Sequence, residues 1–342
     1  MKVLVTGSEG YIGAVLRDVL CENGHEPVGL DTAYFQECDF GAPPTPIPLI
    51  QKDIRHVTGD DLAGFDALIH LAALSNDPLG SIEPGLTHEI NTEASIRLAE
   101  LAKEAGVSRF LFSSSCSLYG KDTAMGLTEA ATPRPQTAYA ASKAAFEQAL
   151  SALADDTFSP TFLRNATAFG LSPRLRFDIV VNNLCGWAWC VGNIVMTSDG
   201  TQRRPLVHVR DISRAFVCAL DAPREAVHNE AFNVGSCENN LQIHDIAYKV
   251  QKQMPQCEIA FGTDEGDTRT YSVDFDKIET GLPGFGKAQI PVDDGIAELL
   301  GAFKRLDLED KSFSSRLYTR LLQIRHLQET KQLDEKLFWM GT

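Results

Sequence analysis

The chain of 342 residues is 44% hydrophobic and 23% charged, the composition of an ordinary globular protein, and its length predicts about two domains. Its formal charge of −15 excludes nucleic acid as the main partner, because phosphate backbones need a basic face, although a few local Arg side chains can still bind a small anion. No apolar run approaches a membrane span, no signal segment is seen, and the 8 scattered Cys form no CxxC, so we expect a cytoplasmic chain without membrane contact, disulfides or a metal site.

The first half of the chain alternates strand-like and helix-like segments. Apolar β-rich runs predict strands at residues 2–6, 27–31, 67–71, 109–114 and 161–164. Helical periodicity predicts helices at about residues 11–23, 92–105 and 138–154. Strands joined through helices of this length indicate right-handed βαβ units, and continuous apolar strands indicate a sheet covered on both faces. We therefore expect an α/β fold with a doubly wound parallel (Rossmann) sheet.

The rhythm becomes irregular after about residue 169. We expect strands at 205–209 and 231–234 to return to the sheet, and helices at 243–254, 295–306 and about 314–339. This predicts a cofactor domain of residues 1–169 plus about 205–236. A smaller interleaved C-terminal lobe of about 170–204 and 237–342 is expected to bind substrate. The last helix carries an apolar stripe expected to fold back onto that lobe, with a partner-binding helix as the alternative; its members are Leu317, Leu321, Ile324, Leu327 and Leu333.

A glycine-rich loop, Gly7-Ser8-Glu9-Gly10-Tyr11-Ile12-Gly13, joins the first predicted strand to the first predicted helix. Glycines there allow a tight turn and a close approach to a pyrophosphate, which the helix N-terminus also attracts. The spacing is GxxGxxG rather than GxGxxG, so an unliganded turn remains an alternative. Asp31 ends the next strand, where a carboxylate binds a ribose 2′-OH and repels a 2′-phosphate. The pattern favours NAD over NADP.

A second pattern pairs Tyr139 with Lys143 at the start of a predicted helix, where positions i and i+4 share one face. A phenol with a pKa near 10 is a poor base at neutral pH, and an adjacent ammonium favours the phenolate. Tyr248 and Lys252 have the same spacing but lie far along the chain from the glycine loop, so we interpret them as an ordinary helix pair. The same plain interpretation remains open for Tyr139.

A serine-rich segment, Ser113-Ser114-Ser115-Cys116-Ser117-Leu118-Tyr119-Gly120, follows the strand expected at 109–114. Carboxyl ends of strands in open α/β sheets face the ligand crevice. A hydroxyl there can hydrogen-bond a substrate alcohol while a base removes its proton. A turn that satisfies its own backbone is the alternative.

Taken together, these motifs resemble the extended short-chain dehydrogenase/reductase family, and within it the NAD-dependent nucleotide-sugar epimerase/dehydratase branch. The resemblance covers roughly residues 1–305 and includes TGxxGxxG at 6–13, Asp31, SSSCSLYG and YxxxK. Further matching motifs lie at residues 53–54, 71–73, 91, 163–165, 204–209, 232–235 and 269–274.

The resemblance implies roles for individual residues. The catalytic set is Ser115, Tyr139 and Lys143. NAD is expected to contact Gly7, Gly10, Tyr11, Ile12, Gly13, Asp31, Asp53, Ile54, Leu71, Ala72, Ala73, Asn91, Ser113, Tyr139 and Lys143. The nucleotide-diphosphate sugar is expected to contact Ser75, Cys116, Ser117, Asn165, Asn182, Arg204 and Arg269. For Cys116 a small packing residue beneath the sugar is the preferred interpretation, and for Asn182 a polar residue in helix packing is the alternative. Arg suits that task because its planar fork grips phosphate oxygens in pairs, although an ordinary surface ion pair is the alternative for each. A homodimer is expected from the resemblance alone.

The expected reaction is inversion at C4 through a transient 4-keto sugar. One departure from the family bears on this: relatives that eliminate water usually carry Asp-Glu directly after the catalytic hydroxyl residue, where this chain has Cys116 and Ser117. Dehydratase chemistry with Cys116 assisting, decarboxylation and 4-ketoreduction remain alternatives, as does a sensor that keeps the fold without the chemistry. The intact Ser115, Tyr139 and Lys143 argue against a sensor.

Overall fold

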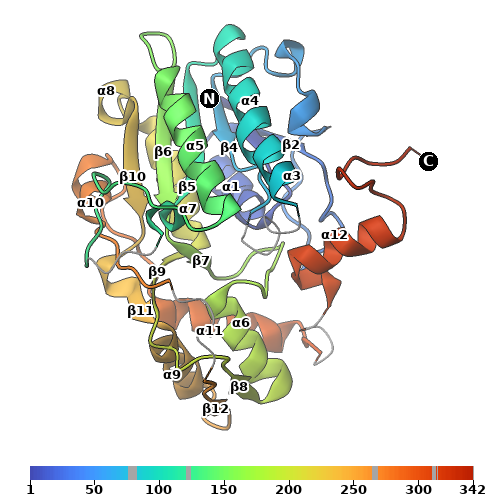
Figure 1. The fold of residues 1–342 in the computed structure, drawn as a ribbon, viewed down its shortest axis with the longest axis vertical. Coiled ribbons are helices and arrows are strands. Elements are labelled where there is room, and N and C mark those ends of the chain that lie inside the picture. Colours follow the sequence, from blue (N-terminus) through green and yellow to red (C-terminus); the bar gives the residue numbers. More distant parts are fainter. Residues whose placement is uncertain (76–82, 121–124, 264–268, 310–312, 314, 342) are drawn as a thin grey trace.

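The computed structural model describes residues 1–75, 83–120, 125–263, 269–309, 313 and 315–341. Within them, seven strands form one parallel sheet in the order β10-β6-β5-β4-β1-β2-β3 (Figure 1). The bounds are β1 Lys2–Thr6, β2 Glu26–Asp31, β3 Leu49–Gln51, β4 Ala67–His70, β5 Arg109–Ser115, β6 Ser159–Asn165 and β10 Glu230–Val234. This confirms the doubly wound α/β fold and the early strands expected from their apolar runs.

Helices cover both faces of this sheet (Figure 1). On one face α3, α4 and α5 pack together, and on the other α1 packs against α7. The bounds are α1 Tyr11–Glu22, α3 Pro84–His88, α4 Ala94–Glu104, α5 Ala138–Ala152 and α7 Val209–Asp221. A π-helical segment, Glu89–Glu93, runs into α4, so the helix expected at 92–105 begins within this irregular turn.

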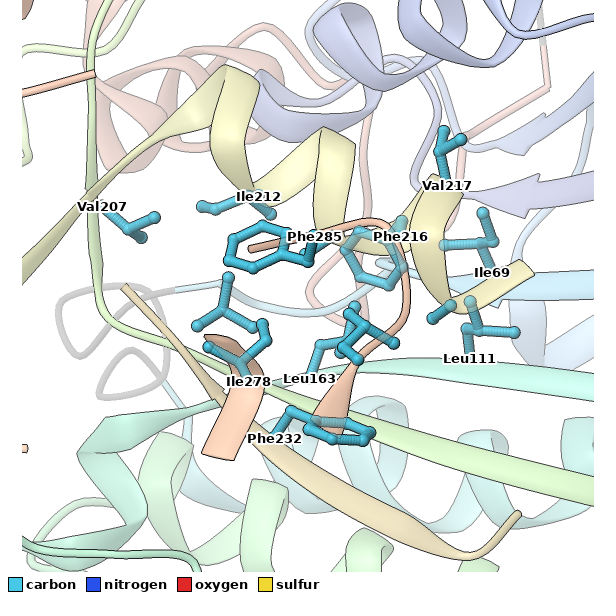
Figure 2. Close-up of a cluster of buried hydrophobic side chains, with 14 of the residues drawn as sticks. Ile69, Leu111, Leu163, Val207, Ile212, Phe216, Val217, Phe232, Ile278 and Phe285 are labelled. Carbon is cyan, nitrogen blue, oxygen red and sulfur yellow. The ribbon is translucent and has the colours of Figure 1, made fainter. Parts of the chain in front are cut away.

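The apolar contacts between α7 and the sheet form the core on one face (Figure 2). Ile212 and Phe216 of α7 are fully buried with Leu111 of β5 and Leu163 of β6. Phe232 of β10 belongs to the same cluster. Because both faces bury apolar side chains, the strands need no polar alternation, which explains the continuous apolar runs in the sequence.

A smaller lobe lies at the carboxyl ends of the sheet strands (Figure 1). Its elements are β7 Thr167–Phe169, α6 Val180–Gly186, β8 Asn193–Val195, β9 Arg203–His208, β11 Asn240–Gln242, α9 Ile243–Gln253, β12 Glu258–Ala260 and α11 Val292–Arg305. The strand expected at 205–209 is present as β9, but it does not return to the large sheet. It pairs with β7 and β11 in a separate sheet. The remaining short helices are α8 Arg224–Val227 and α10 Asp276–Gly281.

The C-terminal segment differs from the single long helix expected at 314–339. Residue 314 lies outside the described residues, and residues 315–341 contain a 3₁₀ turn, Arg316–Tyr318, followed by the helix α12, Arg320–Glu329. Ile324 and Leu327 of α12 belong to the same apolar cluster as Leu4 of β1 and Leu30 of β2, in the seven-stranded sheet. Leu317 packs instead in the smaller lobe. The expectation that the whole stripe folds onto the smaller lobe is therefore wrong. No helix in the described residues has both the length and the apolar content of a membrane span.

Candidate active site

One cleft lies between the carboxyl ends of the sheet strands and the smaller lobe, with a cavity volume of about 450 Å³. That is within the usual range for small-molecule sites. Most residues expected at the site line this cleft: Gly7, Gly10, Tyr11, Ile12, Gly13, Asp31, Asp53, Ile54, Leu71, Ala72, Ala73, Ser75, Ser113, Ser115, Ser117, Tyr139, Lys143, Asn165, Arg204 and Arg269. Segments that are distant in sequence thus line the same cleft.

The glycine loop between β1 and α1 is packed against backbone on several sides. Gly7 has φ +75°, and a Cβ there would lie 2.7 Å from the Ala72 nitrogen. A Cβ on Gly13 would lie 2.3 Å from the Gly7 carbonyl oxygen, whereas one on Gly10 would lie 3.2 Å from the same atom. Gly7 and Gly13 therefore keep the turn tight at the first turn of α1, where free N–H groups and the helix dipole attract an anion.

The carboxylate of Asp31 lies beside this loop at the end of β2. It accepts hydrogen bonds from the backbone N–H of Glu9, at 2.9 Å, and of Ala33, at 2.8 Å. Burial raises the pKa of Asp31, and these two hydrogen bonds oppose the rise. The carboxylate is thus fixed in position at the cleft wall, with lone pairs left for a ribose hydroxyl.

Two elements bring the catalytic candidates together. Ser115 ends β5, and its Oγ accepts a hydrogen bond from the Ser117 nitrogen at 3.2 Å, which starts the 3₁₀ turn Cys116–Tyr119. Thr137 caps α5 by accepting from the Ala140 nitrogen at 3.1 Å, so Tyr139 lies in the first turn of that helix. Helix geometry then brings Lys143 beside the Tyr139 ring, with Nζ 5.5 Å from the ring centroid.

Lys143 is held from the strand side as well. Its Nζ donates to the Ser113 carbonyl oxygen at 2.8 Å and lies 4.6 Å from the Phe112 ring centroid. Burial lowers the pKa of Lys143 from 10.5 to about 7, although the charge of Glu147 opposes the shift. The ammonium is therefore positioned in a site where charge is costly unless an anion or a polar ligand compensates it.

This buried ammonium predicts a pH dependence of stability. Between about pH 7 and pH 10.5 the unfolded chain binds more protons at Lys143 than the folded chain does, so its contribution to the free energy of unfolding rises with pH. Lys143→Met removes this dependence. In urea titrations of cofactor-free protein from about pH 6 to pH 9, we expect the variant's stability relative to wild type to be greatest at low pH and to decline as pH rises. Parallel curves for the two proteins would contradict the assignment.

Three polar atoms near the catalytic residues have no hydrogen-bond partner in the described part of the chain. They are the Oγ of Ser114, the Oγ of Ser117 and the Oδ1 of Asn165, all buried on residues that line the cleft. Asn165 is fixed by its amide, which donates to the Ser113 Oγ at 3.0 Å. Buried polar atoms usually have partners, so these three indicate where a polar ligand contacts the protein.

Arg204 and Arg269 lie on the smaller-lobe side of the cleft. The Arg204 guanidinium, on β9, donates to the backbone carbonyls of Arg203 and Arg269, and its Cζ lies 5.9 Å from the Tyr271 ring centroid. The two basic residues are thus neighbours, as a diphosphate-binding pair requires.

Three expected site residues do not line the cleft. Cys116 is 1% exposed and its Sγ donates to the Arg164 carbonyl at 3.1 Å, so the thiol packs behind the cleft wall. Asn182 is fully buried and exchanges hydrogen bonds with the backbone of Gly170. Asn91 hydrogen-bonds the backbone of Leu74 and therefore supports the wall from behind. None of these three side chains lies on the cleft lining, so ligand contact by them stays a prediction.

Several cleft residues were not anticipated from sequence. Arg176 forms a pair with Asp178 at 2.7 Å and donates to the Ser75 Oγ at 3.2 Å. Burial opposes ionisation of Asp178, but the Arg176 charge holds the pKa of that carboxyl below its ordinary value. Arg320 of α12 also lines the cleft. The closely spaced basic residues Arg174 and Arg176 could have indicated the Arg176–Asp178 pair from the sequence. Nothing in the sequence near Arg320 indicated a site.

Comparison of the sequence with known proteins identifies a family that uses NAD, in agreement with a cleft built around a glycine-rich loop. A family model described as the NAD dependent epimerase/dehydratase family matches residues 3–235. The chain is 28% identical over 277 residues to a UDP-glucose 4-epimerase of Corynebacterium glutamicum, an alignment that covers 77% of this chain and 81% of the relative.

Solved structures share the fold. MoeE5 in complex with UDP-glucose and NAD aligns with a TM-score of 0.77 at 26% identity, covering 89% of this chain and 99% of that one. The NAD-dependent NDP-hexosamine 5,6-dehydratase TunA aligns with a TM-score of 0.79 at 24% identity, covering 90% and 99%.

Proposed function

Because the chain belongs to the NAD dependent epimerase/dehydratase family, we propose that it is a nucleotide-sugar epimerase that uses NAD to invert C4 of the sugar. The observation that carries this proposal is one cleft lined by the glycine loop, Asp31, Ser115, Tyr139 and Lys143. The relatives named UDP-glucose 4-epimerase support the same reaction, and they make UDP-sugars the first substrates to test.

The residues present fit NAD. The packed glycines leave room for a pyrophosphate against backbone N–H groups at the start of α1, as the Cβ positions at Gly7 and Gly13 indicate. Asp31 offers a fixed carboxylate to the adenosine ribose, which favours NAD over NADP. The residue expected to hold the nicotinamide ribose is Lys143, beside the Tyr139 ring. Bound NAD supplies a hydride acceptor and then, in reduced form, a hydride donor.

The chain's own residues supply the proton chemistry. Tyr139, as phenolate, removes the proton of the sugar C4 hydroxyl, while Ser115 hydrogen-bonds the same oxygen. Lys143 stabilises the phenolate through its charge. Loss of this proton together with the C4 hydride, for which NAD would be the acceptor, leaves a 4-keto sugar. Its diphosphate is held at Arg204 and Arg269, so the sugar can turn over and present its other face. Tyr139 then returns the proton to the C4 oxygen when the hydride is given back to the opposite face of C4.

The chemistry at positions 116 and 117 favours epimerisation over elimination. The chain has no carboxylate at either position. Burial raises the pKa of the Cys116 thiol, which also lies behind the cleft wall, so it is poorly suited to act as an acid or base there. Epimerisation requires only the Ser, Tyr and Lys set.

The test is a substrate panel. Purified protein is incubated with UDP-, GDP-, CDP- and dTDP-sugars, and the products are followed by proton NMR, mass spectrometry and NADH absorbance. We expect C4 inversion of one class of sugar with no net change in NADH. A product lighter by one water would establish elimination, and stoichiometric NADH consumption would establish ketoreduction; either result would replace the epimerase proposal.

A further inference from the structure

Arg320 is a buried cation at the cleft wall that the proposed mechanism does not use. It is the first residue of α12, is 2% exposed and lines the cleft. It lies outside residues 3–235, the segment matched by the family model. The family match therefore assigns Arg320 no role.

The guanidinium of Arg320 is only partly satisfied. Its Nη2 donates to the Arg174 carbonyl at 2.9 Å, and its Cζ lies 4.3 Å from the Phe35 ring centroid. Its Nη1 is buried, and within the described chain it has neither a hydrogen-bond partner nor a carboxylate at ion-pair distance. Burial, together with the nearby charge of Arg176, lowers the pKa of Arg320 to about 10.

The two neighbouring arginines have carboxylate partners, unlike Arg320. Arg174 pairs with Glu9 and Asp39, and Arg176 pairs with Asp178. A buried guanidinium with an unused N–H is unfavourable unless an anion binds it, because desolvation of the charge and of the donor is not repaid. The described contacts of Arg320 therefore leave its Nη1 as an unpaired cationic donor at the cleft wall.

The surroundings indicate which anion Arg320 binds. Its hydrogen-bond acceptor, Arg174, also donates from Nε to the Glu9 carbonyl in the glycine loop, at 3.3 Å. Tyr11, the first residue of α1, lines the same cleft as Arg320. Arg320 is thus joined through Arg174 to the glycine loop and shares a cleft with the helix N-terminus that attracts a pyrophosphate.

We propose that Arg320 donates its free N–H to the pyrophosphate of bound NAD, so that the C-terminal helix takes part in holding the cofactor. This proposal rests on the NAD-dependent function proposed above. A diphosphate also occurs in the sugar substrate, but its expected ligands, Arg204 and Arg269, belong to the smaller lobe. The hydrogen bonds that join Arg320 through Arg174 to the glycine loop favour the dinucleotide.

The tail after α12 fixes this helix against the adenosine side of the cleft. Tyr34 donates its hydroxyl to the Leu337 carbonyl, and Trp339 Nε1 donates to the Thr32 carbonyl at 2.7 Å. Phe338 lies under the Arg55 guanidinium, whose Cζ is 3.7 Å from the ring centroid. These contacts join the C-terminus to the segments that follow β2 and β3, which explains how a helix from the end of the chain reaches the cofactor cleft.

The test compares Arg320→Met with wild type, using the full chain after removal of NAD. Calorimetric titration with NAD⁺ and, separately, with UDP measures the two affinities, and thermal unfolding of the ligand-free proteins measures stability. We expect the dissociation constant for NAD⁺ to rise about 10- to 100-fold, as loss of a charge-assisted hydrogen bond implies, with UDP binding unchanged. The melting temperature of the ligand-free variant should equal or exceed that of wild type, because an uncompensated buried charge is removed.

Arg316→Met is the matched control. Arg316 contacts Gln323 and Glu37 and does not line the cleft, so its loss should leave NAD⁺ binding unchanged. Arg320→Lys keeps the charge without the planar fork and should bind NAD⁺ with intermediate affinity, which also tests the proposal if the Met variant does not fold.

Other results would overturn the proposal. NAD⁺ affinity within about twofold of wild type in Arg320→Met would show a structural role only, and weakened binding of UDP alone would assign the guanidinium to the substrate. A wild-type protein that binds no NAD⁺ would instead overturn the proposed function itself, whatever the variants show.

Discussion

Tyr139→Phe should reduce turnover by about three orders of magnitude while leaving NAD binding unchanged. The substitution removes only the hydroxyl that exchanges a proton with the sugar. The ring keeps its place in the first turn of α5, where the Thr137 cap and Lys143 fix its surroundings. Initial rates on the substrate identified from the panel, together with the NAD content of the purified protein, measure the two effects separately.

Tyr248→Phe is the matched control for this prediction. Tyr248 also has a Lys four residues later, but it lies on α9, is 52% exposed and is absent from the cleft lining. Its replacement should leave turnover unchanged. If Tyr139→Phe retained more than about a tenth of wild-type activity, Tyr139 would not be the proton-transfer residue.

Gly13→Ala should abolish measurable NAD binding and destabilise the fold. The added Cβ would lie 2.3 Å from the Gly7 carbonyl oxygen and 2.7 Å from two backbone atoms of Ser8, so the loop itself must move. Displacing the loop by even a few tenths of an ångström removes the N–H geometry that binds a pyrophosphate. Calorimetric titration with NAD⁺ and thermal unfolding report the two losses.

Gly301→Ala, in α11, is the control for the general effect of replacing a glycine. A Cβ at Gly301 would meet no atom within 4 Å, so this variant should be as stable as wild type or more so, by about 0.5–1 kcal/mol. Full NAD affinity in Gly13→Ala would show that the loop does not form the pyrophosphate site.

Local sequence patterns correctly predicted the early strands of the seven-stranded sheet and the helices that cover it. The strand predicted at residues 2–6 is β1, and the helix predicted at about 138–154 is α5, Ala138–Ala152. These segments are specified by short-range signals: apolar runs that fit a covered parallel sheet, and a cap that starts a helix. The glycine loop, Asp31 and the Tyr139–Lys143 pair could be recognised in the sequence for the same reason. The loop occupies one turn, Asp31 ends one strand, and the pair lies on one helix face, so each is defined by local structure.

The smaller lobe was less predictable because its short strands depend on partners far along the chain. β9 has an apolar pattern that suits either sheet, and only its pairing with β7 and β11 decided which one it joins. Cys116 presented a similar ambiguity. Its place after Ser115 suggested contact with the sugar, but the 3₁₀ turn directs its thiol to the Arg164 carbonyl.

The sequence by itself determined the α/β class, the phosphate-type loop and the candidate proton-transfer residues, because each follows from local periodicity and side-chain chemistry. Only the tertiary structure decided that Arg320 reaches the cleft and that Asn182 and Cys116 do not. Those outcomes depend on which buried surface each element packs against, which is a long-range property of the whole chain. The net charge of −15 illustrates the same division: it describes the chain as a whole, whereas the cations proposed to bind an anion are gathered locally at the cleft by folding.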